Sequence, residues 1–208
     1  MSVFRPFRFI SKLEIEACAL DIWLQMERSL RSLQLPIDAS LIAEFLDLDL
    51  VWDTIADDEQ GAIAARILPL EKLIEINENI PQLKGGFGES TIAHEIGHWI
   101  LHIDTEKVDS YIRLKQKGVD VKVKPFLCRS SNLARIEWQA QYFAGCLLMP
   151  QHILTELKQD LDLTKWQHLY QMAGKLGVTI SNLTTRLQDL GWIYLDDQTR
   201  KIYLNRIN

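Results

Sequence analysis

The clearest chemistry in this chain belongs to His94, Glu95 and His98, which form the pattern H-E-x-x-H. The segment from Ser90 to His102 predicts one helix. Because an α-helix turns once in about 3.6 residues, His94 and His98 lie on one face and can bind the same metal ion. Glu95 is rotated by roughly 100° from His94, so it can contact a metal-bound water without being a ligand. The pattern is typical of zinc hydrolases.

The flanks of this pattern favour a metal site over two ordinary histidines. The residues around it are uncharged and mostly apolar: Ile92, Ala93, Ile96, Gly97, Trp99, Ile100 and Leu101. Such a helix should be largely buried, and burying two imidazoles and a carboxylate is costly unless they are paired or bind a metal. The composition therefore predicts that the three polar side chains form a site.

A catalytic zinc site usually has three protein ligands, so a third should exist elsewhere. Asp104 would serve in a metzincin-like site, but that arrangement needs a glycine at position 101, where this chain has Leu101. His102 lies another four residues along the helix, too far up its axis to share the ion. We expect His102 at the helix end, as a partly cationic ring near the negative end of the helix dipole.

A second predicted helix offers Glu137 as the better third ligand. Glu137 lies close to the apolar face of this helix, where a solvated carboxylate would be unexpected. The small residues Ala140 and Ala144 would let the helix approach the first one closely. From spacing alone, Glu137 could equally pair with an arginine. This helix should begin after the N-cap candidates Ser130, Ser131 and Asn132 and should end before Pro150.

Two segments some forty residues apart match a known pair of motifs. The first is A-H-E-I-G-H at 93–98, and the second is E-x-x-A-x-x-F-A-x-x-L-L-M-P at 137–150. Together they resemble the ImmA/IrrE family of bacterial metallo-endopeptidases, over roughly residues 36 to 193. The resemblance implies that Glu137 is the third metal ligand. Where the family often has Asn or Asp, this chain has Gln141, a longer amide that could support a ligating histidine.

The resemblance also implies a mechanism of peptide hydrolysis. A metal held by His94, His98 and Glu137 would polarise the scissile carbonyl and lower the pKa of its bound water. Glu95 would take the proton from this water and deliver it to the departing amine. Zinc suits this ligand set, and manganese is the alternative. A further donor should stabilise the oxyanion, and the sequence does not choose among Tyr111, Arg129, Tyr142 and His152.

Composition limits the compartment and the partners. With 208 residues, of which 47% are hydrophobic, the chain can bury one good core, or one core and a small satellite domain. A net charge of −5 argues against a protein that mainly coats nucleic acid or an anionic membrane. The three cysteines, Cys18, Cys128 and Cys146, are odd in number and lack C-x-x-C spacing. No segment approaches the roughly 20 apolar residues of a membrane span. We expect a cytoplasmic protein.

The chain predicts an α+β fold in two parts. Residues 1–150 should form a mostly helical, zincin-like peptidase domain with a small β-sheet. In it, residues 11–33 have helical spacing, Pro36 starts a second helix, and residues 62–68 and 72–77 form two strands. The substrate cleft should lie beneath the edge of the sheet. This edge could bind an extended substrate as an added strand, or could simply face solvent.

Residues 151–208 should form a small helix-turn-helix-like or winged-helix-like segment. Within it, residues 169–193 have the spacing of two helices that cross over a tight turn, and the last residues predict a closing hairpin or wing. From residue 153 onward there are seven Lys or Arg against six Asp or Glu, too few for strong phosphate contacts. We expect packing or partner recognition rather than DNA binding. The predicted exposed residues of the second helix are Ser181, Asn182, Thr184, Thr185 and Arg186.

The leading hypothesis is a cytoplasmic zinc metallo-endopeptidase that cleaves one specific protein. The resemblance implies a helix-turn-helix transcriptional repressor as its substrate, cut in a stress response to relieve repression. One alternative is a DNA- or partner-binding regulator that acts through residues 169–193, with a structural or vestigial metal site. Another is a toxin-like or antitoxin-like interaction protein. The locally basic run 115–129 predicts a solvated loop or, alternatively, a docking surface for an acidic partner.

Overall fold

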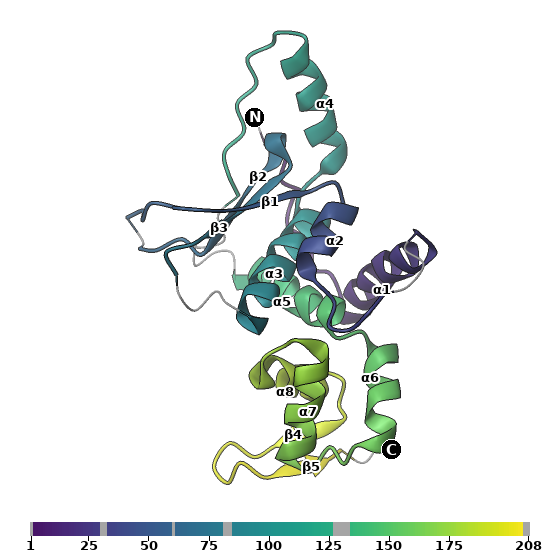
Figure 1. Ribbon diagram of the computed structural model, residues 1–208. Helices are drawn as coiled ribbons and strands as arrows, with labels where there is room; N and C mark the ends of the chain where they lie inside the picture. The colour runs from purple at the N-terminus through teal and green to yellow at the C-terminus, as the bar shows by residue number, and fades with distance from the viewer. Residues whose placement is uncertain (1, 30–32, 60, 81–84, 127–133, 206–208) are drawn as a thin grey trace.

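The computed structural model describes residues 2–29, 33–59, 61–80, 85–126 and 134–205. Figure 1 shows two crossing helices, α3 and α5, near the centre, with a small sheet above them and the C-terminal helices below them. The elements are α1 (Lys12–Ser29), α2 (Ala39–Phe45), β1 (Asp49–Asp53), β2 (Ala65–Leu68), β3 (Leu73–Asn77), α3 (Gly86–His102), α4 (Thr105–Gln116), α5 (Ala134–Leu148), α6 (Gln151–Leu157), α7 (Trp166–Leu176), α8 (Ile180–Asp189), β4 (Ile193–Leu195) and β5 (Ile202–Leu204). The predicted α+β class is confirmed.

Helices α3 and α5 approach closely because small residues face each other between them. A Cβ atom at Gly97 would lie 3.0 Å from the carbonyl oxygen of Ala140, 3.1 Å from its Cα and 3.2 Å from a ring carbon of Phe143. Ala140 is fully buried in the same contact. Glycine in the H-E-x-x-H segment therefore lets the backbone of α5 lie against α3. The N-cap candidates at 130–132 lie outside the described residues.

The sheet has the order β1-β3-β2. The two predicted strands are present as β2 and β3, which pair antiparallel, whereas β1 pairs parallel to β3 and was not predicted. The sequence of β1, Asp-Leu-Val-Trp-Asp, is mostly exposed and has no buried alternation to indicate a strand. Helix α2 begins at Ala39, so the predicted start at Pro36 is wrong. The carboxylate of Asp38 caps this helix by accepting a hydrogen bond from the Ser40 amide at 2.7 Å.

The C-terminal part is a helix pair followed by a hairpin. Helices α7 and α8 are joined through Gly177, whose φ of +67° lies in the left-handed region that favours glycine. Strands β4 and β5 pair antiparallel, which confirms the predicted closing hairpin. In the described parts of the chain, no helix combines the length and hydropathy that crossing a membrane requires.

The second helix of this pair, α8, packs against α5 and is bonded to α1. Arg186 is only 2% exposed and Thr184 only 7%, so the prediction that these two residues face solvent is wrong. The Arg186 guanidinium donates to both carboxylate oxygens of Glu16 in α1, at 2.5 and 2.8 Å, and to the carbonyl of Met149 at 3.1 Å. An ion-pair partner far away in the sequence thus turns this face of α8 inward. Ser181 remains exposed as predicted.

The basic run is described as far as residue 126. Its lysines are exposed, but Phe126 is buried and exchanges two backbone hydrogen bonds with Ile67 of β2, at 2.9 and 3.2 Å. The outer edge of β2 is therefore occupied at Ile67. Ala65 at the beginning of this strand, and Ala62 and Ala64 before it, border a cleft instead.

Candidate metal centre

Helix α3 places His94 and His98 one turn apart on the same face, as the spacing predicts. Their Nε2 atoms are 3.0 Å apart. His98 is fully buried, and Phe126 lies against its ring with 4.8 Å between the ring centroids. The two Nε2 atoms are therefore close enough to bind the same ion.

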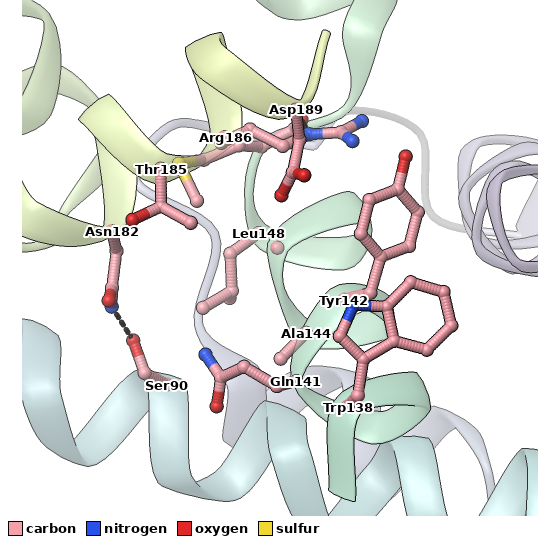
Figure 2. A pocket seen from close by; sticks show the side chains of 12 residues that line it. Ser90, Trp138, Gln141, Tyr142, Ala144, Leu148, Asn182, Thr185, Arg186 and Asp189 are labelled. Carbon is pink, nitrogen blue, oxygen red and sulfur yellow. Dashed lines mark hydrogen bonds between the residues drawn. The ribbon is translucent and has the colours of Figure 1, made fainter. Parts of the chain in front are cut away.

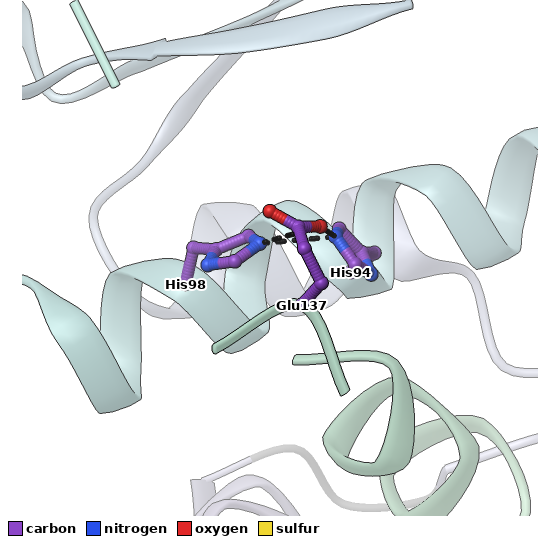
Figure 3. A group of neighbouring side chains, drawn as sticks. All are labelled: His94, His98 and Glu137. Carbon is purple, nitrogen blue, oxygen red and sulfur yellow. Dashed lines mark hydrogen bonds and ion pairs between the residues drawn. The ribbon is translucent and has the colours of Figure 1, made fainter. Parts of the chain in front are cut away.

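Glu137 reaches the same point from α5. Its Oε2 lies 3.1 Å from His94 Nε2 and 3.7 Å from His98 Nε2, and Figure 3 shows the carboxylate between the two rings. The ligand atoms of the three residues all lie within 4.8 Å of one another. The structure thus brings together the three residues that the sequence predicts as ligands. The close contact of α3 and α5 at Gly97 makes this convergence possible.

This donor set fits a zinc ion in both chemistry and spacing. Two imidazoles and one carboxylate are a common ligand set of catalytic zinc. Ligand atoms about 2.0–2.2 Å from a tetrahedral ion lie about 3.3–3.6 Å from one another. The observed separations of 3.0, 3.1 and 3.7 Å are close to this range. A small inward or outward shift of each side chain would accommodate the ion.

The two histidines have opposite pKa shifts. Burial lowers the pKa of His98 to about 4, so its ring is neutral near pH 7 and can offer a lone pair. Burial acts in the same direction on His94. However, the hydrogen bond to Glu137 and the charge of Glu95 outweigh burial and raise the pKa of His94. A proton and a metal ion therefore compete for His94, which makes metal binding dependent on pH.

Glu95 is the fourth predicted site residue, and it lies beside the histidines without being part of the ligand group. It is 5% exposed, and burial raises its pKa to about 7. Its Oε2 atom is buried and has no hydrogen bond to any residue that the structure describes. A buried carboxyl with a pKa near neutrality suits a general base or acid.

A cleft of about 310 Å³ opens over these residues. It is bordered by α3 and α5, by the start of β2 and by one residue of α8: Ala62, Ala64, Ala65, Phe87, Ser90, Thr91, His94, Glu95, Glu137, Gln141 and Asn182. Its position at the start of β2 agrees with the expected cleft beneath the sheet edge. The ligand group is thus open to a substrate from one side.

Comparison with known proteins assigns the family. Residues 55–188 match the model of a peptidase family described as the IrrE N-terminal-like domain. The chain belongs to this family. It is also similar to a solved structure titled "Mycobacterium tuberculosis transcriptional regulator", with 16% identity and a TM-score of 0.47. The match covers 88% of this chain and 49% of that one, so the chain spans about half of its length. No curated protein matches the chain.

In this IrrE-like protein, His102 does not have the predicted cationic role. It is the last residue of α3, but it is only 8% exposed, and burial lowers its pKa. Its Nδ1 lies 2.9 Å from Nδ1 of His98, and its Nε2 lies 2.9 Å from Oε1 of Gln139. Packing of α5 over the helix end thus replaces solvent and keeps the ring neutral.

These contacts fix which nitrogen of each ring carries a proton. The Gln139 amide donates from Nε2 to the Arg8 carbonyl at 3.1 Å, so its oxygen faces His102 and accepts from the Nε2 of that ring. A neutral His102 then has a lone pair on Nδ1, which accepts the Nδ1 proton of His98. This leaves the lone pair of His98 on Nε2, the atom that faces Glu137. Such an outer partner of a ligating histidine orients the ring.

In this IrrE-like protein, the described candidates for the oxyanion donor lie away from the cleft. The Tyr142 hydroxyl donates to Glu16 at 2.9 Å, and the His152 ring packs on Trp23. Neither residue lines the cleft, and neither does Tyr111, so they do not supply the predicted oxyanion donor. Arg129 lies outside the described residues.

Two polar neighbours of the metal centre complete the site. Gln141 lines the cleft together with His94 and contributes to the raised pKa of that ring. Asn182 was not predicted here; its amide donates to Ser90 of α3 at the border of the cleft. Asp104 caps α4 by accepting from the Lys107 amide at 3.2 Å and takes no part in the site. Asn182 was missed because the helical pattern alone assigned its face to solvent.

Proposed function

We propose that this protein is a zinc-dependent metallo-endopeptidase. His94, His98 and Glu137 would hold the metal, with manganese as the alternative ion, and Glu95 would be the general base. The observation that carries the proposal is the convergence of the three ligand groups beside the buried carboxyl of Glu95. A structural zinc site would close the fourth position with another protein ligand, whereas this group opens onto a cleft.

The residues divide the work of peptide hydrolysis between them. When bound, the metal ion polarises the scissile carbonyl and lowers the pKa of water. Glu95 removes the proton from the attacking water and returns it to the departing amine. Burial raises the pKa of this carboxyl, which favours its uptake of the proton from water. The chain from His98 through His102 to Gln139 holds one ligand ring in place during these steps.

The finer proposal concerns the substrate. Membership of the ImmA/IrrE-type peptidase family supports a protein substrate. We propose a helix-turn-helix transcriptional repressor that is cleaved in the cytoplasm under stress. We also propose the division into a peptidase domain at 1–150 and a helix-turn-helix-like segment at 151–208. The contacts of α8 favour packing over DNA binding, because Arg186 is held by Glu16 and Asn182 by Ser90.

The test is a comparison of the wild type with Glu95→Gln, using zinc content by mass spectrometry and cleavage of candidate repressors and a randomised peptide library. Both proteins should bind one zinc per chain. Only the wild type should cleave, and the variant should lose at least about a hundredfold in rate. Glu106→Gln, on the exposed side of α4, is the matched control and should cleave as the wild type does. Cleavage by Glu95→Gln at the wild-type rate would contradict the proposal.

A further inference from the structure

A second cavity, of about 350 Å³, lies between α5 and α8 next to the metal cleft. Figure 2 shows Leu148 at its floor, Trp138 and Tyr142 on one side, and Asn182 and Thr185 on the other. Gly145 of α5 and Met149, which directly follows α5, also line it. The cavity is thus bounded by one helix that carries a metal ligand and one from the C-terminal part of the chain.

The two cavities adjoin each other. Ser90, Gln141 and Asn182 line both of them. Gln141 lies one turn after Glu137 on α5, and the hydrogen bond from Asn182 to Ser90 joins α8 to α3 at this border. A peptide whose scissile bond lies at the candidate metal centre would therefore place a neighbouring residue beside the second cavity. The polar side chains at the border could hydrogen-bond to its backbone amides.

The charged groups at the far end of the cavity are already paired within the chain. Arg186 is bonded to Glu16, and Lys12 contacts Asp189 at 2.6 Å. The Lys12 ammonium also lies 4.9 Å from the centre of the Tyr142 ring, where a substrate cation would otherwise bind. Because each charge has a partner, the cavity offers no uncompensated charge to a charged substrate side chain.

Apart from Thr185, the rest of the surface is apolar. Trp138 is 39% exposed and forms one wall, while Leu148 and Met149 are buried and contribute the floor. Gly145 leaves additional room, because a Cβ atom built there would meet nothing closer than the Arg186 Cδ at 3.7 Å. A side chain at this position would fill space that the cavity now leaves open.

We propose that this cavity is a specificity subsite that binds a bulky apolar side chain of the substrate on one side of the scissile bond. The proposal rests on the proposed peptidase function of the adjoining cleft. Trp138, Gly145 and Leu148 set the size of the subsite. An apolar pocket of this kind discriminates by contact area, so Leu, Met or Phe is preferred to Ala or Gly at one substrate position by tenfold or more, a ratio typical of such pockets.

The first experiment is a cleavage profile of the zinc-loaded chain on a peptide library, with the products sequenced by mass spectrometry. We compare the wild type with Gly145→Leu, which fills the subsite. Its matched control is Gly174→Leu, a helical glycine in α7 where an added Cβ meets no atom within 4 Å. The control should keep the wild-type profile. Gly145→Leu should prefer Ala or Gly at one position only and keep its other preferences; an unchanged profile would overturn the subsite.

A second readout does not depend on cleavage. N-acetyl-leucine methylamide is titrated into the ¹⁵N-labelled, zinc-loaded wild type, and the Trp138 indole signal is followed by NMR. We expect this signal to shift in the wild type and in Gly174→Leu, and to stay unchanged in Gly145→Leu. If the shifts occur without any cleavage of the library, the peptidase proposal fails and the apolar subsite stands. If the signal does not shift in the wild type, or shifts equally in Gly145→Leu, the subsite is wrong.

Discussion

At the scale of single residues, the proton positions at His98 depend on a side chain from another helix. Gln139 accepts from His102, and His102 in turn accepts from His98, so the ligand nitrogen of His98 is left with its lone pair. The two motifs in the sequence were enough to predict which four side chains the structure brings together at the candidate site. The role of His102 could not be predicted from the sequence, because its charge state is decided by burial under α5 rather than by its position at a helix end.

Replacing His102 should weaken metal binding without removing a ligand. In His102→Phe, the Nδ1 proton of His98 loses its acceptor and the ring its fixed orientation, so the zinc dissociation constant should rise about 10–100-fold. Competition with a chromophoric chelator measures this change. His152→Phe is the control, because that ring packs on Trp23 away from the cleft. Equal zinc affinity in His102→Phe and the wild type would show that the contact does not support the site.

At the scale of elements, the candidate metal centre depends on how closely α5 lies against α3. Small residues in both motifs made this close approach predictable, and the structure locates it at Gly97 and Ala140. Other elements were less accessible to prediction. Strand β1 carries no alternating pattern, and the start of α2 is set by the capping carboxylate of Asp38 rather than by Pro36.

Because of the packing at Gly97, we expect its replacement by Ala to lower the free energy of unfolding, whereas helix propensity alone would raise it. Gly→Ala in an unhindered helix stabilises by about 1 kcal/mol, as we expect for Gly174→Ala in α7. In Gly97→Ala the new methyl group would lie 3.0–3.2 Å from Ala140 and Phe143, so we expect a loss of about 1–3 kcal/mol and weaker zinc binding. Urea denaturation and zinc titration measure both. A Gly97→Ala protein as stable as Gly174→Ala would contradict the proposed helix contact.

At the scale of the whole molecule, the C-terminal helices are tied to the peptidase core by the pair of Arg186 and Glu16. The helix pair and the final hairpin could be predicted from spacing and turn residues. The inward orientation of α8 could not, because the partner of Arg186 lies 170 positions earlier in the chain. The same inward face brings Asn182 to the cleft, so the docking of these helices completes the lining of the site.

Removing the carboxylate should loosen this docking. Glu16→Gln leaves the Arg186 guanidinium, which is 2% exposed, without its counter-charge, at a cost of about 3 kcal/mol in unfolding free energy. Chemical denaturation measures this cost, and Glu16→Gln combined with Arg186→Met should recover part of it. Glu27→Gln, at an exposed position of α1, is the control. A Glu16→Gln protein with wild-type stability would contradict the structural role of the pair.

The same pair predicts how stability depends on pH. Burial alone would raise the pKa of Glu16, but the hydrogen bond and charge of Arg186 lower it below its ordinary value of 4.5. A carboxyl with a depressed folded pKa stabilises above its unfolded pKa and loses this contribution as the pH falls through the folded pKa. Wild-type stability should therefore decline below about pH 4.5 more steeply than that of Glu16→Gln. Parallel slopes in denaturation series from pH 6 to acid would contradict this assignment.

The most direct test of the account is the anomalous scattering of zinc in crystals of the zinc-loaded chain. The account predicts one strong peak about 2.0–2.2 Å from Nε2 of His94, Nε2 of His98 and a carboxylate oxygen of Glu137. Glu95 should lie beside the ion without ligating it. A zinc peak elsewhere in the molecule, or a Glu137 side chain turned away from the two imidazoles, would contradict the central claim.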